Sequence, residues 1–382
     1  MRLGTFMMPL HPPTRNPWET YAEDREAILL ADRLGYSEAL VGEHITDLAE
    51  NVTSSLMFLA SVAHDTRHIV LGSGTVTMGN HHPAQIAAQV AMLDHILKGR
   101  FIMGISPGAL RSDAEVFGHY DKDRNEIFLE SINMVLAIWA GEPPYDLVGK
   151  HYTVSTARSR IPELGQGAII KPYQKPHPPI VVTAVAPHSK GVTEAAKRGW
   201  TPLSANFLLP EWVASHWPRY VEGRKAVGAE PNPEEWRVAR SIFVADDDRV
   251  AKRYGHTAEG PYHFYFNQLI RKLIFAGRAN AFKLDPGESD ESVTADAITP
   301  KLVIAGTVAS VVDQILAFRE KIGDFGTLYY ACHDWVDPAL GKRSMQLMAE
   351  EVMPRVNAAI GGETAPLSRG ARNGVRRGVS DA

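Results

Sequence analysis

The chain has 382 residues, of which 45% are apolar and 22% are charged, so it can bury a large core in one large domain or two smaller ones. Its net charge of −4 argues against nucleic-acid binding, and its single cysteine, Cys332, excludes an intrachain disulfide and a cysteine-rich metal site. No apolar run reaches the roughly 18 residues of a membrane span, so we expect a protein of the reducing cytoplasm with no membrane segment.

Short apolar runs alternate with amphipathic stretches through the first hundred residues. Residues 19–34 place apolar side chains at helical spacing, and Gly35 gives this helix its C-terminal stop. The predicted order is a strand at 2–8, the helix at 19–34, a strand at 37–42, a helix near 53–65, a strand at 68–76, a helix from Pro83 to about 97 and a strand at 101–105. This alternation predicts a parallel sheet with helices outside it.

The second half of the chain continues the alternation, with two long interruptions. Residues 141–178 are rich in Gly and Pro, and residues 245–300 are irregular apart from a helical pattern at 262–276. The other predicted helices are 124–140, 188–198, 211–227, 308–322 and 340–358, and the other predicted strands are 179–184, 199–203, 237–244, 302–305 and 326–331.

This order predicts an α/β protein that folds as a closed (β/α)8 TIM barrel, with insertions after its fourth and seventh strands. An open doubly wound sheet is the alternative, but no G-x-G-x-x-G follows the first strand. We expect residues 1–360 to form a single domain. Residues 361–382 are rich in Gly, Arg and Ser and predict a disordered tail, either simply solvated or in contact with RNA or another acidic partner.

In a (β/α)8 barrel the active site lies at the C-terminal ends of the strands. Small and polar residues follow the predicted strands at this end, and histidines recur among them. They are His11, Arg15 and Trp18 after the first strand; Glu43 and His44 after the second; Ser73, Gly74, Thr75, Asn80, His81 and His82 after the third; Ser106, Pro107 and Gly108 after the fourth; Ala184 to Ser189 after the fifth; and Cys332 and His333 after the last. This concentration predicts a functional site there.

Glu43 and His44 directly follow an apolar strand, in the sequence VGEHITD. His44 is either a functional imidazole or a polar residue at a loop start, and Glu43 either supports it, caps the next turn or pairs with an arginine. His81 and His82 precede Pro83 and indicate a helix start. There is no H-E-x-x-H, and adjacent histidines seldom serve one ion, so we expect no metal.

Residues 183–191, TAVAPHSKG, join a strand to a helix and place Ser189 near its first turn. Free N–H groups and a hydroxyl at this position suit a phosphate. Ordinary helix capping explains the same residues equally well. The glycines at 72, 74 and 79 either let a flat ligand approach the backbone or only relieve crowding.

Several segments, taken as an ordered set, resemble the bacterial luciferase-like flavin monooxygenase family, whose members are (β/α)8 barrels. They are RLGTFMMP, ADRLGYSEALVGEHI, VLGSGTVTMGNHHPAQIAAQVAMLDHILKGRFIMGISPG and AKRGWTPLS, and the match runs over most of residues 1–358. The most specific features are E-H after the second strand, H-P before the third helix and L-D-x-x-x-x-G-R-F. The segments LGTFMMPLHPP and GEHITD are similar to the limonene 1,2-monooxygenase-like subgroup.

The resemblance implies roles for the matching residues. His44 would be the active-site histidine beside the flavin, and Glu43, its acidic neighbour, would orient or polarise it, so both are predicted to be catalytic residues. The segment 73–75 would lie under the isoalloxazine ring, where the family often has a non-prolyl cis peptide. Ser106 would face the flavin, and Ser189 would bind its phosphate. The cofactor-binding residues implied in this way are Ser73, Gly74, Thr75, Ser106, Ala184, His188 and Ser189.

The sequence departs from the family pattern at two positions that concern binding of the flavin phosphate. Pro107 stands where luciferases have an arginine that contacts phosphate, and Arg111 is the replacement that we consider. The segment AVAPHS also lacks a polar residue that many relatives carry two positions after the fifth strand.

The resemblance further implies a two-component monooxygenase that is commonly a homodimer. A separate flavin reductase would supply reduced FMN, which reacts with O2 to a C4a-(hydro)peroxyflavin that oxygenates a small hydrophobic organic substrate. An imidazole such as that of His44, with its ordinary pKa of about 6.5, suits control of the protonation of this flavin adduct. The aromatic run 262–266 would form a lid or pack against the barrel rim. A deazaflavin-dependent dehydrogenase or reductase, a non-catalytic flavin-binding protein and a metal-dependent barrel hydrolase stay open as rival functions.

Overall fold

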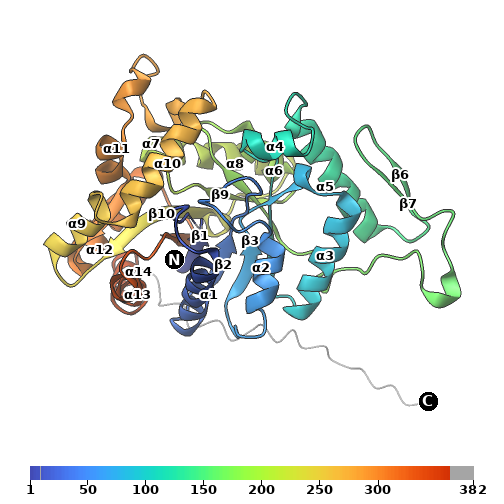
Figure 1. Cartoon of the computed structure of the whole chain (residues 1–382), viewed down its shortest axis with the longest axis horizontal. Helices are drawn as coiled ribbons and strands as arrows, with labels where there is room; N and C mark the ends of the chain where they lie inside the picture. The colour runs from blue at the N-terminus through green and yellow to red at the C-terminus, as the bar shows by residue number, and fades with distance from the viewer. Residues whose placement is uncertain (9, 362–382) are drawn as a thin grey trace.

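Eight parallel strands close into a ring in the computed structural model, which describes residues 1–8 and 10–361 (Figure 1). The pairing of β12 with β1 and of β9 with β10 completes the ring, so the predicted TIM barrel is confirmed and the open sheet is excluded. In ring order the strands are β1 (Arg2–Met7), β2 (Glu38–Val41), β3 (Val70–Ser73), β5 (Phe101–Ser106), β8 (Ile180–Ala184), β9 (Thr201–Ser204), β10 (Arg237–Val244) and β12 (Thr327–Cys332).

Helices between the strands cover the outside of the barrel (Figure 1). Their starts follow the expected capping chemistry: Asn16 accepts a hydrogen bond from the backbone N–H of Trp18, and prolines occupy first turns. These helices are α1 (Pro17–Arg33), α2 (Ser55–Val62), α3 (Pro83–Ile96), α5 (Arg124–Ala140), α6 (Lys190–Lys197), α7 (Pro210–Ala214), α8 (His216–Ala226), α12 (Val308–Ile322), α13 (Pro338–Leu347) and α14 (Met353–Ala359).

The barrel interior is a packed core that is polar at the N-terminal end of the strands. Arg237 donates to both carboxylate oxygens of Glu38, at 2.8 and 3.1 Å, and Tyr329 donates to the same carboxylate. Above them lies an apolar interior layer formed by Phe6, Leu40, Ile102, Val181, Leu203, Ala239 and Tyr329, against which Met8 packs. The filled interior leaves the C-terminal end of the strands as the place where a ligand can meet the barrel.

The insertion after the fourth barrel strand projects as an arm at one side of the molecule (Figure 1). It carries a small antiparallel hairpin, β6 (Asp146–Val148) with β7 (Thr153–Ser155), that the Gly- and Pro-rich sequence did not reveal. Each of these strands has three residues, too few to show a period of two.

The insertion after the seventh barrel strand is more ordered than its sequence suggested. Besides the expected helix, α10 (Pro261–Phe275), it contains α9 (Asp248–His256) and α11 (Ala295–Leu302), so the prediction of an irregular segment was wrong there. Helix α9 shows why the sequence was misleading. Only its residues Ala251, Tyr254 and Gly255 are buried, so most of its sequence is polar and was predicted to be irregular.

The predicted strand at 302–305 exists as β11 (Val303–Gly306), but it lies beside the ring and does not complete it. The first half of β10, 237–240, pairs with β12, whereas its second half, 241–244, pairs with β11. The predicted helix 211–227 is divided between α7 and α8, and 340–358 contains a π-helical turn at Met348–Val352 between α13 and α14.

None of the described helices combines the length and the apolarity that crossing a bilayer requires. Residues 362–382, which include nearly all of the predicted tail, lie outside the described residues.

Candidate functional site

His44 follows β2 at the C-terminal end of the barrel, between two carboxylates. Its Nδ1 lies 2.9 Å from Oδ2 of Asp113, and its Nε2 lies 3.5 Å from Oε2 of Glu50. Burial acts against protonation, but the negative charges of Glu50 and Asp113 outweigh it and raise the pKa of His44 to about 9. His44 is therefore an imidazolium at neutral pH, with a proton on each ring nitrogen.

The two carboxylates that hold His44 are themselves fixed from different parts of the chain. Asp113, on the short helix α4 (Arg111–Val116), also accepts from the backbone N–H and the hydroxyl of Thr46, at 2.9 and 2.6 Å. Glu50 accepts from the ammonium of Lys272, on α10, at 3.1 Å. Asp113, Glu50 and Lys272 were not predicted, because nothing in the sequence places 113 or 272 beside 44.

Glu43 points to a different set of partners. Its buried carboxylate accepts from the backbone N–H and hydroxyl of Ser55, at 2.8 and 2.7 Å, from the backbone N–H of Thr77 at 3.0 Å and from His81 at 3.3 Å. Burial favours its neutral form, but these donors outweigh burial and lower the pKa of Glu43. Glu43 thus holds the start of α2 against the strand that contains Thr77, and the orientation of the His44 ring comes from Asp113.

The segment between β3 and the short strand β4 (Val76–Thr77) forms a platform on the interior layer. The peptide bond between Gly74 and Thr75 is cis, as the resemblance implied. A Cβ added at Gly74 would lie 2.9 Å from Cε2 of Phe6 and 3.0 Å from Cβ of Leu40, so only glycine fits directly above that layer. Thr75 donates to the hydroxyl of Ser106 at 2.6 Å, which joins the end of β5 to the platform.

The neighbouring predicted residues play different parts. The Ser73 hydroxyl is buried and donates to the carbonyl of Gly104 at 2.8 Å, so it serves the barrel wall. Ala184 is also buried, and it packs with Val192, Ala196 and Tyr220 beneath α6 and α8. Any contact of these two positions with a ligand would have to come from their backbone.

Ser189 and His188 lie in the loop between β8 and α6. Ser189 is the N-cap residue of α6, but its side chain makes no capping hydrogen bond, so its hydroxyl is not used to cap the helix. His188 has a positive φ of 49°, and its backbone N–H donates to the hydroxyl of Ser215 at 2.9 Å.

Two arginines that the sequence did not single out lie near each other, one beside this loop and one beside the loop after β5. Arg278 donates to the carbonyl of Val185 at 3.2 Å, and Arg124 donates to the carbonyl of Gly108 at 3.1 Å. Burial lowers the pKa of Arg278, and the nearby charge of Arg124 lowers it further. Within residues 1–8 and 10–361, neither arginine forms a salt bridge with a carboxylate, so both positive charges lack a carboxylate partner there.

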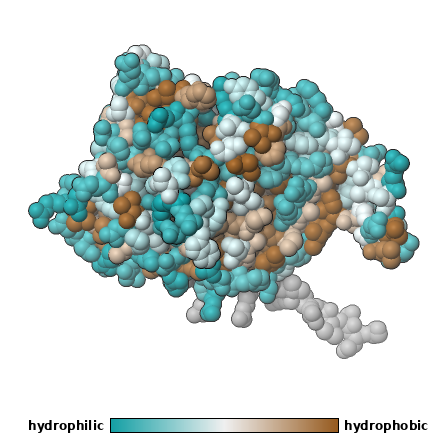
Figure 2. All heavy atoms as spheres, viewed as in Figure 1, coloured by the Kyte–Doolittle hydropathy of each residue, from teal (hydrophilic) through white to brown (hydrophobic). Residues whose placement is uncertain are grey.

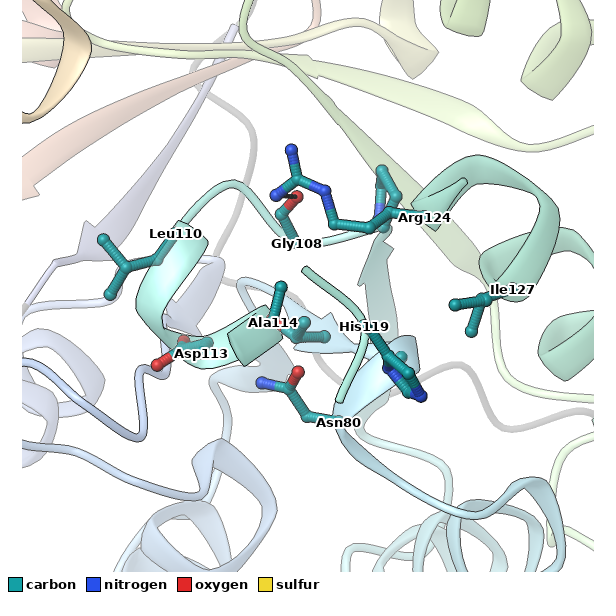
Figure 3. A pocket seen from close by; sticks show the side chains of 11 residues that line it. Asn80, Gly108, Leu110, Asp113, Ala114, His119, Arg124 and Ile127 are labelled. Carbon is teal, nitrogen blue, oxygen red and sulfur yellow. Dashed lines mark hydrogen bonds between the residues drawn. The ribbon is translucent and has the colours of Figure 1, made fainter. Parts of the chain in front are cut away.

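A small pocket borders the site between the 3-10 turn Met78–Asn80 and helices α4 and α5 (Figure 3). Figure 3 shows Arg124, at the start of α5, beside Gly108, while Asp113 lies on α4 at another side of the pocket. The pocket therefore shares residues with both the His44 network and the arginine pair. Arg111, considered above as the replacement for an arginine at 107, lies over the ring of Tyr120, 5.9 Å from its centre.

The aromatic residues of α10 pack onto the end of the barrel. Tyr262, Tyr265 and Phe266 are buried, and the ring of Tyr265 lies 4.2 Å from that of His333, centre to centre. The sequence left open whether these aromatic residues form a lid or pack against the barrel rim, and the structure shows that they pack against it.

A second charged cluster lies beside the site, around His11. His11 contacts Asp334 through Nδ1 and Asp24 through Nε2, and Arg15 donates to both Glu23 and Asp334. Ligand atoms of His11, Glu23 and Asp334 lie within 4.8 Å of one another, but Arg15 already supplies the cation that two of these carboxylates need. The cluster is accordingly an ion-pair network.

Comparisons with known proteins place these features in context. A family model described as luciferase-like monooxygenase matches residues 1–324. The chain is 30% identical over 370 residues to 4-hydroxyprotoasukamycin monooxygenase of Streptomyces nodosus subsp. asukaensis, covering 95% of this chain and 94% of that protein. It is 27% identical to limonene 1,2-monooxygenase of Rhodococcus erythropolis, covering 94% of this chain and 87% of that protein.

Among solved structures, the oxygenating constituent of 3,6-diketocamphane monooxygenase from Pseudomonas putida, a type II Baeyer-Villiger monooxygenase in complex with FMN, has a TM-score of 0.83 to this chain. The two are 26% identical, and the match covers 93% of this chain and 98% of that one.

Replacing Asp113 by Asn should lower the pKa of His44 from about 9 towards its ordinary 6.5, because one of the two compensating charges is lost. Since the folded pKa is raised, protonation of His44 stabilises the fold fully below about pH 6.5 and loses this effect as the pH rises through about 9. Asp113→Asn should reduce that pH dependence. NMR titration of His44 and unfolding at several pH values measure both effects.

The matched control is Glu115→Gln, which removes an exposed carboxylate from the same helix and should leave the His44 titration unchanged. An unchanged titration in Asp113→Asn would show that Asp113 does not hold the proton on His44.

Proposed function

The chain belongs to the luciferase-like monooxygenase family, and from this premise we propose that it is a flavin-dependent monooxygenase. It uses reduced FMN from a separate flavin reductase, together with O2, to oxygenate a small hydrophobic organic substrate. The observation that carries this proposal is the arginine pair, Arg124 and Arg278, which has no carboxylate partner among the described residues. Arg278 contacts the loop after β8, and Arg124 contacts the loop after β5.

The residues fit FMN in two separate ways. Two guanidinium groups, the Ser189 hydroxyl and the free N–H groups at the start of α6 would hold the phosphate. The Gly74–Thr75 platform, with Ser106 beside it, offers a flat surface over an apolar layer and would support the ring system. The full proposed set is Ser73, Gly74, Thr75, Ser106, Ala184, His188 and Ser189, with Arg124 and Arg278 added.

When bound, reduced FMN supplies the electrons that activate O2, so that one oxygen atom enters the substrate and the other leaves as water. In this proposal His44 is the catalytic residue of the chain. As an imidazolium it donates hydrogen bonds to negative charge that develops on oxygen, and it can release and recover a proton.

Asp113 and Glu50 are positioning residues for His44, because they fix its ring and keep it charged. Glu43 accepts hydrogen bonds from the backbone N–H groups of Ser55 and Thr77, and so positions the backbone that carries His44. The packed residues of α10, including Phe266, exclude water from this end of the barrel.

We also propose a homodimer that forms through α2 and α3. These two helices contain a single charged residue, Asp94, and it is buried against Gln174. Their outer faces expose Met57 and Met92, and Figure 2 shows an apolar stretch over α3. A surface depleted of charge is typical of the centre of a protein interface. The proposal places this enzyme in the cytoplasm and treats residues 1–360 as one domain.

The decisive experiment mixes the protein with reduced FMN under anaerobic conditions and then adds O2. We expect a transient absorbance distinct from that of oxidised FMN, and incorporation of one 18O atom from 18O2 into product. His44→Asn should lower product per reduced FMN by about 100-fold or more and release hydrogen peroxide instead.

His82→Asn is the control, because His82 is an exposed histidine that caps α3. Hydride transfer to a deazaflavin without O2 consumption would support the dehydrogenase alternative. Flavin binding with no turnover would support a non-catalytic protein.

A second expectation concerns the arginine pair. Arg278→Met should raise the Kd for FMN by about 10- to 100-fold, because the phosphate loses a charged partner, and should change the Kd for riboflavin by less than about twofold, since riboflavin has no phosphate. Arg111→Met, which removes an arginine over Tyr120, should alter neither. Flavin fluorescence measures all four constants, and equal losses for FMN and riboflavin would contradict the phosphate assignment.

The third expectation concerns assembly. The double variant Met57→Glu, Met92→Glu should change the mass in solution from twice the chain mass to 42.0 kDa, because it buries charge in the proposed interface. Leu164→Glu, on the projecting arm, removes an equally exposed apolar group and should leave the dimer intact. Light scattering after size-exclusion chromatography distinguishes these results.

A further inference from the structure

A buried chain of hydrogen bonds leads from the barrel wall to the loop between β8 and α6. The indole N–H of Trp236 donates to the hydroxyl of Ser204, the last residue of β9, at 2.9 Å. The Ser204 hydroxyl lies 2.8 Å from Nδ1 of His216, and Nε2 of His216 lies 2.9 Å from the carbonyl oxygen of Ala186. The side chains of Trp236, Ser204 and His216 are completely buried. The chain therefore ties the backbone of this loop to the interior of the protein.

The partners decide where the proton of His216 lies. A carbonyl oxygen only accepts, so Nε2 of His216 carries the proton and donates to Ala186. An indole N–H only donates, so the Ser204 hydroxyl accepts from Trp236 and directs its own proton to Nδ1 of His216. Burial lowers the pKa of His216 to about 4, so the ring is neutral, as this arrangement requires. Both ring nitrogens thus have a partner, and the ring is held in one orientation.

The residue before His216 holds the same loop at a second point. The Ser215 hydroxyl accepts from the backbone N–H of His188 at 2.9 Å and donates to the carbonyl of Trp212 at 2.6 Å. His188 has a positive φ of 49°, which residues with a side chain rarely adopt, and the contact with Ser215 holds it there. Ser215 and His216 stand at the junction of α7 and α8, where the sequence predicted one uninterrupted helix.

These contacts fix the backbone of the loop and leave its anion-binding groups available. Arg278, Ser215 and His216 hold Val185, His188 and Ala186 respectively. None of these three contacts uses the Ser189 hydroxyl or the first N–H groups of α6, which follow directly. Helix α6 itself packs against α8, and the two lie side by side in Figure 1. The junction of α7 and α8 therefore sets the position of the loop relative to the barrel.

We propose that Ser215 and His216 are positioning residues for the flavin phosphate, because they hold the loop in the conformation that presents the Ser189 hydroxyl and the start of α6. This inference rests on the function proposed above. Both residues act through the backbone of the loop, on His188 and Ala186. They raise the affinity for a phosphate because a loop that is ordered before binding loses less conformational freedom when the ligand binds.

The experiment compares FMN with riboflavin, which has no phosphate, by flavin fluorescence with the full chain. Ser215→Ala should raise the Kd of FMN by about 3- to 10-fold, because the N–H of His188 loses its partner, and should change the Kd of riboflavin by less than about twofold. Ser37→Ala is the control, since it removes a hydroxyl that donates to the carbonyl of Leu3 at the other end of the barrel. Equal changes for FMN and riboflavin in Ser215→Ala, or no change for FMN, would overturn the inference.

His216 allows a graded comparison. His216→Leu should raise the Kd of FMN by about 10- to 100-fold, whereas His216→Gln keeps an N–H group for the Ala186 carbonyl and should restore part of that loss. His256→Leu is the matched control, because His256 also donates through Nε2 to a backbone carbonyl, that of Val303, and this variant should bind FMN normally. Equal losses in the Gln and Leu variants would contradict the role of the Nε2 proton. Ser215, which is only partly buried, decides the question if a His216 variant does not fold.

Phosphorus NMR of bound FMN supplies a readout that a general loss of stability would not move. The phosphate resonance in Ser215→Ala should shift from its position in the wild-type complex towards that of free FMN, and an unchanged resonance would overturn the inference. Failure of the proposed function is a separate result: the wild-type protein would prefer FMN to riboflavin but show no transient absorbance when reduced FMN meets O2. Equal binding of FMN and riboflavin by the wild-type protein would overturn the inference itself.

Discussion

Closure of the parallel ring is the constraint on which the rest of the structure depends. Because β12 pairs with β1 and β9 with β10, every barrel strand delivers its C-terminal residue to the same end. The ring also fixes which strands stand opposite one another, so the platform after β3 faces Ser241 on β10. The interior layer supports both sides, since Gly74 rests on Phe6 and Leu40, and Met8 packs on the same residues.

Two histidines at this end are set to opposite protonation states by the same physical balance. Burial disfavours the charged ring in both His44 and His333. His44 has Asp113 and Glu50 beside it, and its pKa rises to about 9, whereas His333 has a hydroxyl and two aromatic rings, and its pKa falls to about 3. At neutral pH the ring of His44 is therefore charged and the ring of His333 is neutral.

The sequence predicted the features that depend on local pattern. The strand ends follow from apolar runs and stops, so the positions of His44, Thr75 and Ser106 at one end of a barrel could be predicted from single segments. It could not predict that Asp113, rather than the adjacent Glu43, orients His44, because both are acidic and only the path of the backbone decides between them. The arginine pair was missed for the same reason: Arg124 and Arg278 are 154 positions apart in the sequence, and no motif links them.

The insertion after the seventh strand, which looked irregular in sequence, connects all parts of the site. Its helix α10 contributes Tyr265 to a hydrogen bond with Asn206 and Lys272 to the carboxylates around His44, and Arg278 follows soon after it. A shift of this helix would disturb all three contacts together. Arg278 is held to Val185 and Lys272 to Glu50, so both contacts fix the C-terminal end of α10, whereas Tyr265 lies near its N-terminal end. The helix therefore links the residues around His44 to the loop after β8 through direct hydrogen bonds.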